Sequence, residues 1–206
     1  MIDKKEVIFN SAKELFAAKG FKDTGISDIT RQAGLSVGTF YNYYPSKDKL
    51  FVEIMEQETA TLMKRIMNSI NLDDDPVKLV KQLLILNMEG MLSNPILCQW
   101  YKPDVYRKIE TLFREENGLE AMEFLYRDFI KLVQKWQLEG KMRADISSEM
   151  IMAIFEAIIR TGYHKEEIGL QYFPELQDHL TEFVLKGLTD CEKKQTAEKF
   201  TNKNDG

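Results

Sequence analysis

The sequence is poor in the residues that build metal centres, disulfide frameworks and acid–base sites. Its 206 residues include two cysteines, Cys98 and Cys191, and two histidines, His164 and His179. Neither pair has the spacing of a zinc ligand set or a redox motif. The chain also has no nucleophile elbow, phosphate-binding glycine loop or metalloprotease helix motif. The sequence therefore argues against an enzyme, and we expect no catalytic residues, no metal and no cofactor.

Long apolar runs are missing as well. No stretch approaches the roughly 20 residues that a transmembrane helix needs. Residues 1–16 alternate charged and apolar side chains and lack the apolar block of a signal peptide. These two features predict a cytoplasmic protein that does not associate with a membrane.

Glycine and proline are sparse, with eleven and five residues, and no segment alternates apolar and polar residues at period two. Apolar residues recur at helical spacing instead, so the sequence predicts an all-α protein. Asp75 followed by Pro76 indicates an N-cap and a first helical residue, which explains the acidic run 73–75 better than a metal site does. We expect helices at 5–19, 26–33, 37–44, 47–70 and 76–92, short helices at 96–101 and 103–115, and three more at the apolar stripes 119–136, 151–159 and 176–188.

Basic charge is in deficit overall but not at the N-terminus. The net charge is −5, which argues against a protein coated with basic residues for nucleic acid. Residues 1–50, however, carry eight Lys/Arg against six Asp/Glu, a balance of +2, whereas the other 156 residues have a balance of −7. If part of the chain meets a polyanion, we expect it to be the first fifty residues.

Residues 26–44 match a helix-turn-helix of the DNA-binding kind. Gly34 lies in the tight turn between two short helices, and Ser36 is the expected N-cap of the second. The outward positions of that helix carry small or polar residues, which would let its backbone approach base edges. The alternative is a three-helix bundle with no role in DNA binding.

Four of the five residues 40–44 are aromatic. Phe40 and Tyr44 are four apart and should share a buried face, whereas Tyr41 and Tyr43 should leave their hydroxyls available to phosphate oxygens. Plain packing remains the alternative for Tyr41. Lys47, Ser27 and Thr24 are further candidates for phosphate contacts near helix N-termini. The predicted DNA-binding residues are Thr24, Gly25, Ser27, Ser36, Val37, Gly38, Thr39, Tyr41, Asn42, Tyr43 and Lys47.

This segment resembles the TetR family of bacterial transcriptional regulators. The resemblance runs through Ile8, Ala12, Leu15-Phe16, Gly20-Phe21, Thr24, Ile26, Asp28-Ile29, Ala33-Gly34-Leu35-Ser36, Gly38-Thr39-Phe40-Tyr41, Tyr44, Ser46-Lys47 and Leu50. It departs at Gly25, where many members carry Thr or Ser, at Thr30, where a small alanine is usual, and at Val37, which favours a thymine methyl over a hydrogen bond. It implies a DNA-binding domain at residues 1–47 and a helical effector-binding and dimerisation domain at 48–190. The polar composition of residues 191–206 predicts a frayed tail.

The resemblance also implies a homodimer that binds a pseudo-palindromic operator in double-stranded DNA and is released from it by a small molecule. Because no charged cluster interrupts the apolar stripes, we expect a lipophilic or aromatic effector. A ligand-independent, architectural DNA-binding protein is the alternative.

Two further sets of residues follow. For each candidate of the effector pocket, packing in the core is the alternative. The candidates are Met88, Met91, Trp100, Tyr101, Tyr106, Phe113, Met122, Leu125, Tyr126, Phe129, Phe155 and Tyr163. The last two long helices carry more apolar residues than one buried stripe needs, so the expected dimer interface comprises Ile151, Ile154, Phe155, Ile158, Leu180, Phe183, Val184 and Gly187.

Overall fold

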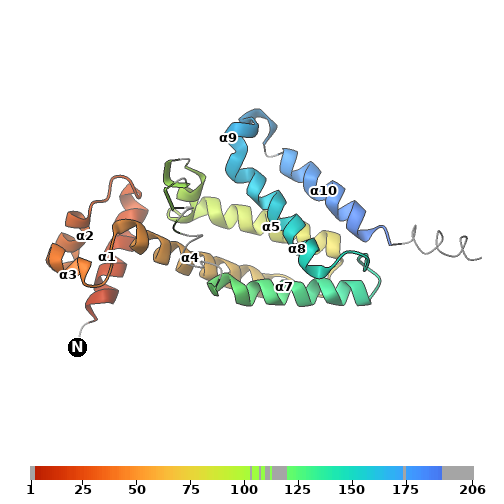
Figure 1. Cartoon of the computed structure of the whole chain (residues 1–206), viewed down its shortest axis with the longest axis horizontal. Coiled ribbons are helices and arrows are strands. Elements are labelled where there is room, and N and C mark those ends of the chain that lie inside the picture. The colour runs from red at the N-terminus through yellow and green to blue at the C-terminus, as the bar shows by residue number, and fades with distance from the viewer. Residues whose placement is uncertain are drawn as a thin grey trace, which may run out of the picture. The chain divides into compact units, whose positions relative to one another are not determined.

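A computed structural model describes residues 3–102, 104–106, 108–109, 112, 120–173 and 175–191, with only the backbone at 120–125 and at Tyr163. In this part of the chain every regular element is a helix, as the sequence predicts (Figure 1). The main helices are α1 (Lys4–Lys19), α2 (Ile26–Ala33), α3 (Val37–Tyr41), α4 (Lys47–Ser69), α5 (Pro76–Ser93), α7 (Glu120–Leu138), α8 (Ser148–Thr161) and α10 (Glu175–Thr189). Short turns of helix are η1 (Leu97–Tyr101), η2 (Gly162–His164), α9 (Lys165–Ile168) and η3 (Leu170–Tyr172).

Helix ends fall where capping side chains occur. The Asp75 carboxylate accepts hydrogen bonds from the N–H groups of Val77 at 2.9 Å and Lys78 at 3.3 Å, which confirms the expected cap of α5. The expected third helix is shorter than predicted. Regular helix ends at Tyr41, and the N–H groups of Tyr43 and Tyr44 both donate to Phe40 O in a tight turn before Pro45.

The chain divides into two compact units. Unit 1 comprises Met1–Ser69 and Ile85–Glu123, and unit 2 comprises Ile70–Leu84 and Phe124–Gly206. Helix α4 therefore belongs along its whole length to the unit that holds α1, α2 and α3. Three buried rings, Phe16, Phe21 and Phe51, form part of the unit 1 core, with the Phe16 and Phe51 centroids 4.9 Å apart and edge to face.

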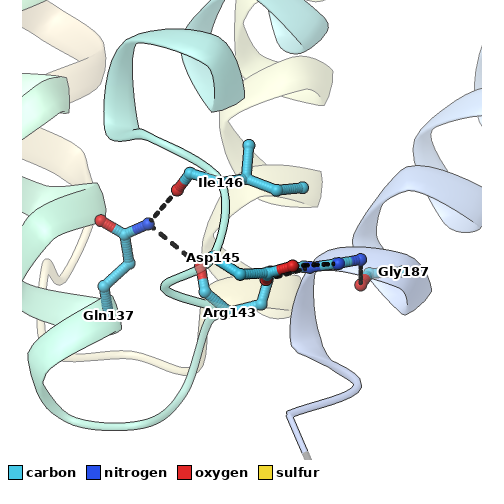
Figure 2. A network of polar contacts seen from close by, with 5 residues as sticks. All are labelled: Gln137, Arg143, Asp145, Ile146 and Gly187. Atoms are coloured by element: carbon cyan, nitrogen blue, oxygen red, sulfur yellow. Dashed lines mark hydrogen bonds and ion pairs between the residues drawn. The ribbon is translucent and has the colours of Figure 1, made fainter. Parts of the chain in front are cut away.

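Unit 2 has its own apolar core, which is built from α5, α7, α8 and α10. Its buried members are Leu79, Val80, Leu132, Val133, Trp136, Met142, Ile151, Leu185 and Leu188. The loop after α7 is fastened to this core by polar contacts (Figure 2). The Gln137 amide donates to Arg143 O at 3.0 Å and Ile146 O at 2.8 Å, and the Arg143 N–H donates to Leu188 O at 2.8 Å near the end of α10. The loop thereby holds the last turn of α10 in place.

Candidate nucleic-acid interface

Helices α1, α2 and α3 lie together within unit 1 (Figure 1). Ile29 of α2 and Phe40 of α3 are fully buried, as are Ile8 and Phe16 of α1. Between α2 and α3, Gly34 adopts a left-handed conformation with φ 66°, which an L side chain rarely adopts. The turn predicted from Gly34 is therefore confirmed.

Helix α3 buries its large rings and exposes its small residues. Phe40 and Tyr44 are buried, whereas Tyr41 is 54% and Tyr43 40% exposed, as the spacing predicts. On the outward face Val37, Gly38 and Asn42 are also exposed. A Cβ placed on Gly38 would meet nothing closer than Ser36 Oγ at 3.8 Å, so the surface around it is open.

The N-terminus of α3 is organised by two hydroxyl groups. Ser36 Oγ accepts a hydrogen bond from the Thr39 N–H at 3.1 Å, which confirms Ser36 as the N-cap. The hydroxyls of Ser36 and Thr39 lie 2.9 Å apart and are hydrogen-bonded to each other. Both residues therefore sit at the exposed start of α3, where peptide N–H groups attract anions.

Helix α2 begins at Gly25 without a side-chain cap. The Gly25 N–H donates to Asp28 Oδ2 at 3.2 Å, and this bond is the largest of the causes that lower the pKa of the Asp28 carboxyl. Gly25 has φ −97°, and a Cβ there would make ordinary contacts. Its backbone therefore does not require glycine, and exposed Ser27 remains the hydroxyl at this helix end.

Thr24 is not a phosphate contact. Its side chain is fully buried, and its hydroxyl donates to Gly20 O at 2.8 Å. The expectation from sequence was wrong because a threonine just before a helix can equally hydrogen-bond backward to the preceding turn.

The Lys47 ammonium group forms contacts within the protein itself. Its Nζ donates to Phe21 O at 2.7 Å and Thr24 O at 2.8 Å and lies 4.3 Å from the centroid of the Phe21 ring. Burial, followed by the nearby Lys108 charge, lowers the pKa of Lys47. The ammonium group therefore links two carbonyls of the loop between α1 and α2, and its predicted phosphate contact stays a prediction.

The pocket candidates fall into two groups. In unit 1, Trp100 and Tyr106 meet edge to face with centroids 5.3 Å apart, and burial raises the pKa of Tyr101. Met88 is 41% exposed and Met91 is half-buried. In unit 2, Phe129 and Phe155 pack against the core, and Tyr126 is exposed. Phe113 and the side chains of Met122, Leu125 and Tyr163 lie outside the described residues.

Two of the residues expected at the dimer interface are buried within the single chain. Ile151 is fully buried in the unit 2 core and Ile158 is 6% exposed, so neither is available to a partner. The helical stripe was correct, but it marks the packing of α8 on α10. Phe183, at 65% exposed, and Gly187 do lie on the surface, whereas Ile154, Phe155, Leu180 and Val184 are partly buried.

Sequence reasoning missed Gln99. This residue of η1 is 2% exposed, and its amide is hydrogen-bonded to backbone groups at the end of α1 and just after it. Periodicity cannot reveal such a contact because its partners are main-chain atoms about 80 positions away in sequence. A polar residue between apolar Cys98 and Trp100 is the one local signal.

The described part of the chain also bears on metal binding and on membrane spanning. No three His, Cys, Asp or Glu side chains there are grouped so as to hold a metal ion. None of the helices described is long and apolar enough to span a membrane.

Comparison with known proteins matches the same N-terminal segment. Residues 8–54 fit the model of the bacterial regulatory proteins of the tetR family. The HTH-type transcriptional regulator YuxN of Bacillus subtilis, itself uncharacterized, is 30% identical over 94 residues, which are 46% of this chain and 32% of YuxN. YdgC of the same bacterium, also an uncharacterized HTH-type regulator, is 23% identical over 92% of this chain and 85% of YdgC.

A solved structure shares the fold over most of the chain. The repressor FadR of Thermus thermophilus, in complex with lauroyl-CoA, aligns with a TM-score of 0.61 and 23% identity over 89% of this chain and 94% of FadR. The matched segment contains the helix-turn-helix described above, and every regular element described in the rest of the chain is a helix. Residues 8–54 form a helix-turn-helix domain of the tetR family of bacterial regulatory proteins.

Proposed function

We propose that this protein represses transcription by binding a pseudo-palindromic operator as a homodimer, and that a small lipophilic or aromatic effector releases it. The observation that carries the proposal is the surface of α3. Exposed Val37, Gly38 and Asn42 lie over a buried layer that contains Phe40 and Tyr44. A helix that is anchored by buried rings on one face and exposes small side chains on the other can enter the major groove.

The contacts divide by chemistry. Val37, Thr39 and Asn42 face base edges, where an amide reads adenine and an apolar group contacts the thymine methyl. Tyr41, Tyr43 and Ser27 supply hydroxyls to phosphate oxygens, which position the protein without reading sequence. Ser36, Gly38 and Gly25 let the two helix N-termini approach the backbone of the DNA.

The effector proposal rests on the helical domain. The aromatic side chains Trp100 and Tyr101 of unit 1 and Phe129 of unit 2 are half-buried. FadR of Thermus thermophilus, which shares the fold, was solved with an acyl-CoA. A lipophilic ligand would act only by preferring a dimer whose reading helices are wrongly spaced for the operator.

The first test identifies the operator. Purified protein is mixed with sheared genomic DNA of the organism that encodes it, and the retained fragments are sequenced. We expect a pseudo-palindrome whose half-sites lie about 34–36 Å apart, or a multiple of that spacing.

Gly38→Ala then tests α3 directly. The added methyl meets only Ser36 Oγ at 3.8 Å, so the fold should keep its stability.

We expect Gly38→Ala to weaken operator binding while the dependence of affinity on salt stays unchanged, because phosphate contacts are not altered. Unchanged operator affinity in this variant would show that α3 does not read bases with this face.

For the effector, acyl and aromatic compounds that raise the melting temperature are titrated with and without operator. Because coupling is reciprocal, operator should weaken ligand binding by the same factor.

A further inference from the structure

The Gln99 side chain joins three backbone groups within unit 1. Its Oε1 accepts a hydrogen bond from the Phe21 N–H at 2.6 Å, and its Nε2 donates to Phe16 O at 3.1 Å and Pro95 O at 3.0 Å. The amide is thus oriented in one way, with its oxygen toward the loop after α1 and its nitrogen toward two carbonyls. Because the side chain is 2% exposed, water cannot take over these bonds.

The loop that Gln99 contacts leads directly into the helix-turn-helix. Side chains from elsewhere in unit 1 hydrogen-bond to the backbone of this loop. Lys47 Nζ donates to Phe21 O and Thr24 O, and Gln99 Oε1 accepts from the Phe21 N–H. The Thr24 hydroxyl in turn takes Gly20 O. Helix α2 begins one residue later, after Gly25, so the position of this loop sets the position of the α2 N-terminus.

The segment that carries Gln99 is itself anchored to α4. Asn94 Oδ1 accepts from the N–H groups of Ile96 at 2.9 Å and Leu97 at 3.1 Å and so caps the turn. Asn94 Nδ2 donates to Glu58 Oε2 at 2.6 Å, and Glu58 also pairs with Lys13 of α1 at 2.5 Å. Burial works to raise the pKa of Glu58, but the hydrogen bonds from Lys13 and Asn94 hold it below its ordinary value.

We propose that residues 94–99 form a tether that holds the end of α1 and the α1–α2 loop in the position in which α2 and α3 bind DNA, with Gln99 as its positioning residue. Operator affinity falls when this amide loses its bonds. The proposal rests on the DNA-binding function proposed above and adds a control point outside the helix-turn-helix.

The direction of the Gln99 amide gives a sharp test. In Gln99→Glu a carboxylate oxygen replaces the nitrogen that donates to Phe16 O and Pro95 O. The ionised side chain then faces two carbonyl oxygens and cannot donate to either. A buried carboxyl beside acceptors has a raised pKa, so lowering the pH restores one donor. Gln99→Met keeps the length of the side chain but removes its hydrogen bonds at every pH.

Unit 2 offers a matched control. The Gln137 amide also donates to two backbone carbonyls, those of Arg143 and Ile146 (Figure 2), but it holds the α7–α8 loop rather than α1. Gln137→Glu therefore makes the same chemical change away from the tether. Operator affinity is measured by fluorescence anisotropy from pH 5.5 to 8 on the genomic fragment that the wild type retains. All variants are used at concentrations where sedimentation gives the wild-type oligomeric state.

At pH 8 we expect Gln99→Glu to bind operator about tenfold or more weakly than wild type, because a buried polar contact is lost. We expect much of this deficit to disappear toward pH 5.5. Gln99→Met should bind weakly by a ratio that does not change with pH, and Gln137→Glu should follow the wild type. If both Gln99 variants bind as tightly as wild type at pH 8, the tether does not set operator affinity.

Amide hydrogen exchange supplies a readout that does not involve DNA. In Gln99→Glu and Gln99→Met, the peptide over residues 17–25 should exchange faster than in wild type, and in Gln137→Glu it should not. Unchanged exchange there in both Gln99 variants overturns the tether even if affinity falls. If the wild type retains no DNA, the proposed function is wrong, and so is the link between the tether and operator affinity. Hydrogen exchange still tests the tether itself in that case, so the failure of the tether and the failure of the proposed function give different results.

Discussion

At the scale of single residues, Lys47 shows a basic side chain committed to its own backbone. Its ammonium group donates to Phe21 O and Thr24 O and lies over the Phe21 ring. These two carbonyls belong to the α1–α2 loop, where they have no helical N–H donor. A cation that satisfies two loop carbonyls contributes to folding whether or not DNA is present.

We therefore expect Lys47→Met to lower the free energy of unfolding by about 2–3 kcal/mol, the scale of lost hydrogen bonds to a charged group. Chemical denaturation measures this loss, and the salt slope of operator binding should change little. Ser27→Ala provides the contrast because Ser27 is exposed at the start of α2. It should weaken DNA binding with almost no loss of stability. A drop of about 1 in the salt slope for Lys47→Met would instead restore the phosphate contact.

The side chains of this site differ in how far sequence predicts them. The burial of Phe40 and Tyr44 and the exposure of Tyr41 and Tyr43 follow from helical spacing alone. Spacing gives the face of a residue but not its hydrogen-bond partner. The hydroxyl of Thr24 was therefore assigned to the wrong partner, the two internal acceptors of Lys47 were not foreseen, and Gln99 was not found.

At the scale of elements, α4 and α5 approach closely at Gly90, in unit 1. A Cβ on Gly90 would overlap Leu62 Cδ1 and lie 3.1 Å from Leu62 Cγ, and Leu62 is 4% exposed. The leucine of one helix therefore packs onto the bare backbone of the other. Next to this crossing, Asn94 and Glu58 join the same two regions of the chain.

Gly90→Ala should destabilise the protein by about 1–3 kcal/mol, because Leu62 must leave its place in a packed core. The midpoint of urea unfolding reports this loss. In the background of Leu62→Ala, whose short side chain leaves room, adding Gly90→Ala should cost nothing further. Equal costs in the two backgrounds would mean that the contact does not limit how closely the helices approach.

The long helices were predicted within a few residues because their apolar stripes run for several turns. Helix α9 and the turn η3 were missed, since four and three residues are too few to show a period. Helix α3 was predicted three residues too long because aromatic spacing continued past the point where Phe40 O takes two N–H donors.

At the scale of the whole molecule, the proposed homodimer depends on surface that the single chain leaves uncovered. On α10, Phe183 is 65% exposed and stacks on His179 with ring centroids 6.0 Å apart. Ile151 and Ile158 of α8 are consumed by the chain's own core. The sequence could not separate these roles, because an apolar residue has the same appearance in a core and at an interface.

Phe183→Asp should convert the dimer to a folded monomer, since an exposed ring contributes little to folding of the single chain. Sedimentation velocity gives the mass and circular dichroism the helix content. Ile151→Asp is the matched opposite, because it places an unpaired charge in the unit 2 core and should unfold the chain. A Phe183→Asp protein that remains dimeric would move the interface away from this part of α10.

The contact made by Gln99 also bears on how the protein can change through descent. Its amide recognises only main-chain atoms of Phe16, Phe21 and Pro95, and none of their side chains. A substitution at position 16 or 21 that keeps an apolar ring leaves these bonds intact, so no mutation there demands a compensating one at position 99. Among related sequences we expect glutamine to be kept at position 99 while the residues at positions 16 and 21 vary. Correlated substitutions between these positions would therefore not reveal the contact.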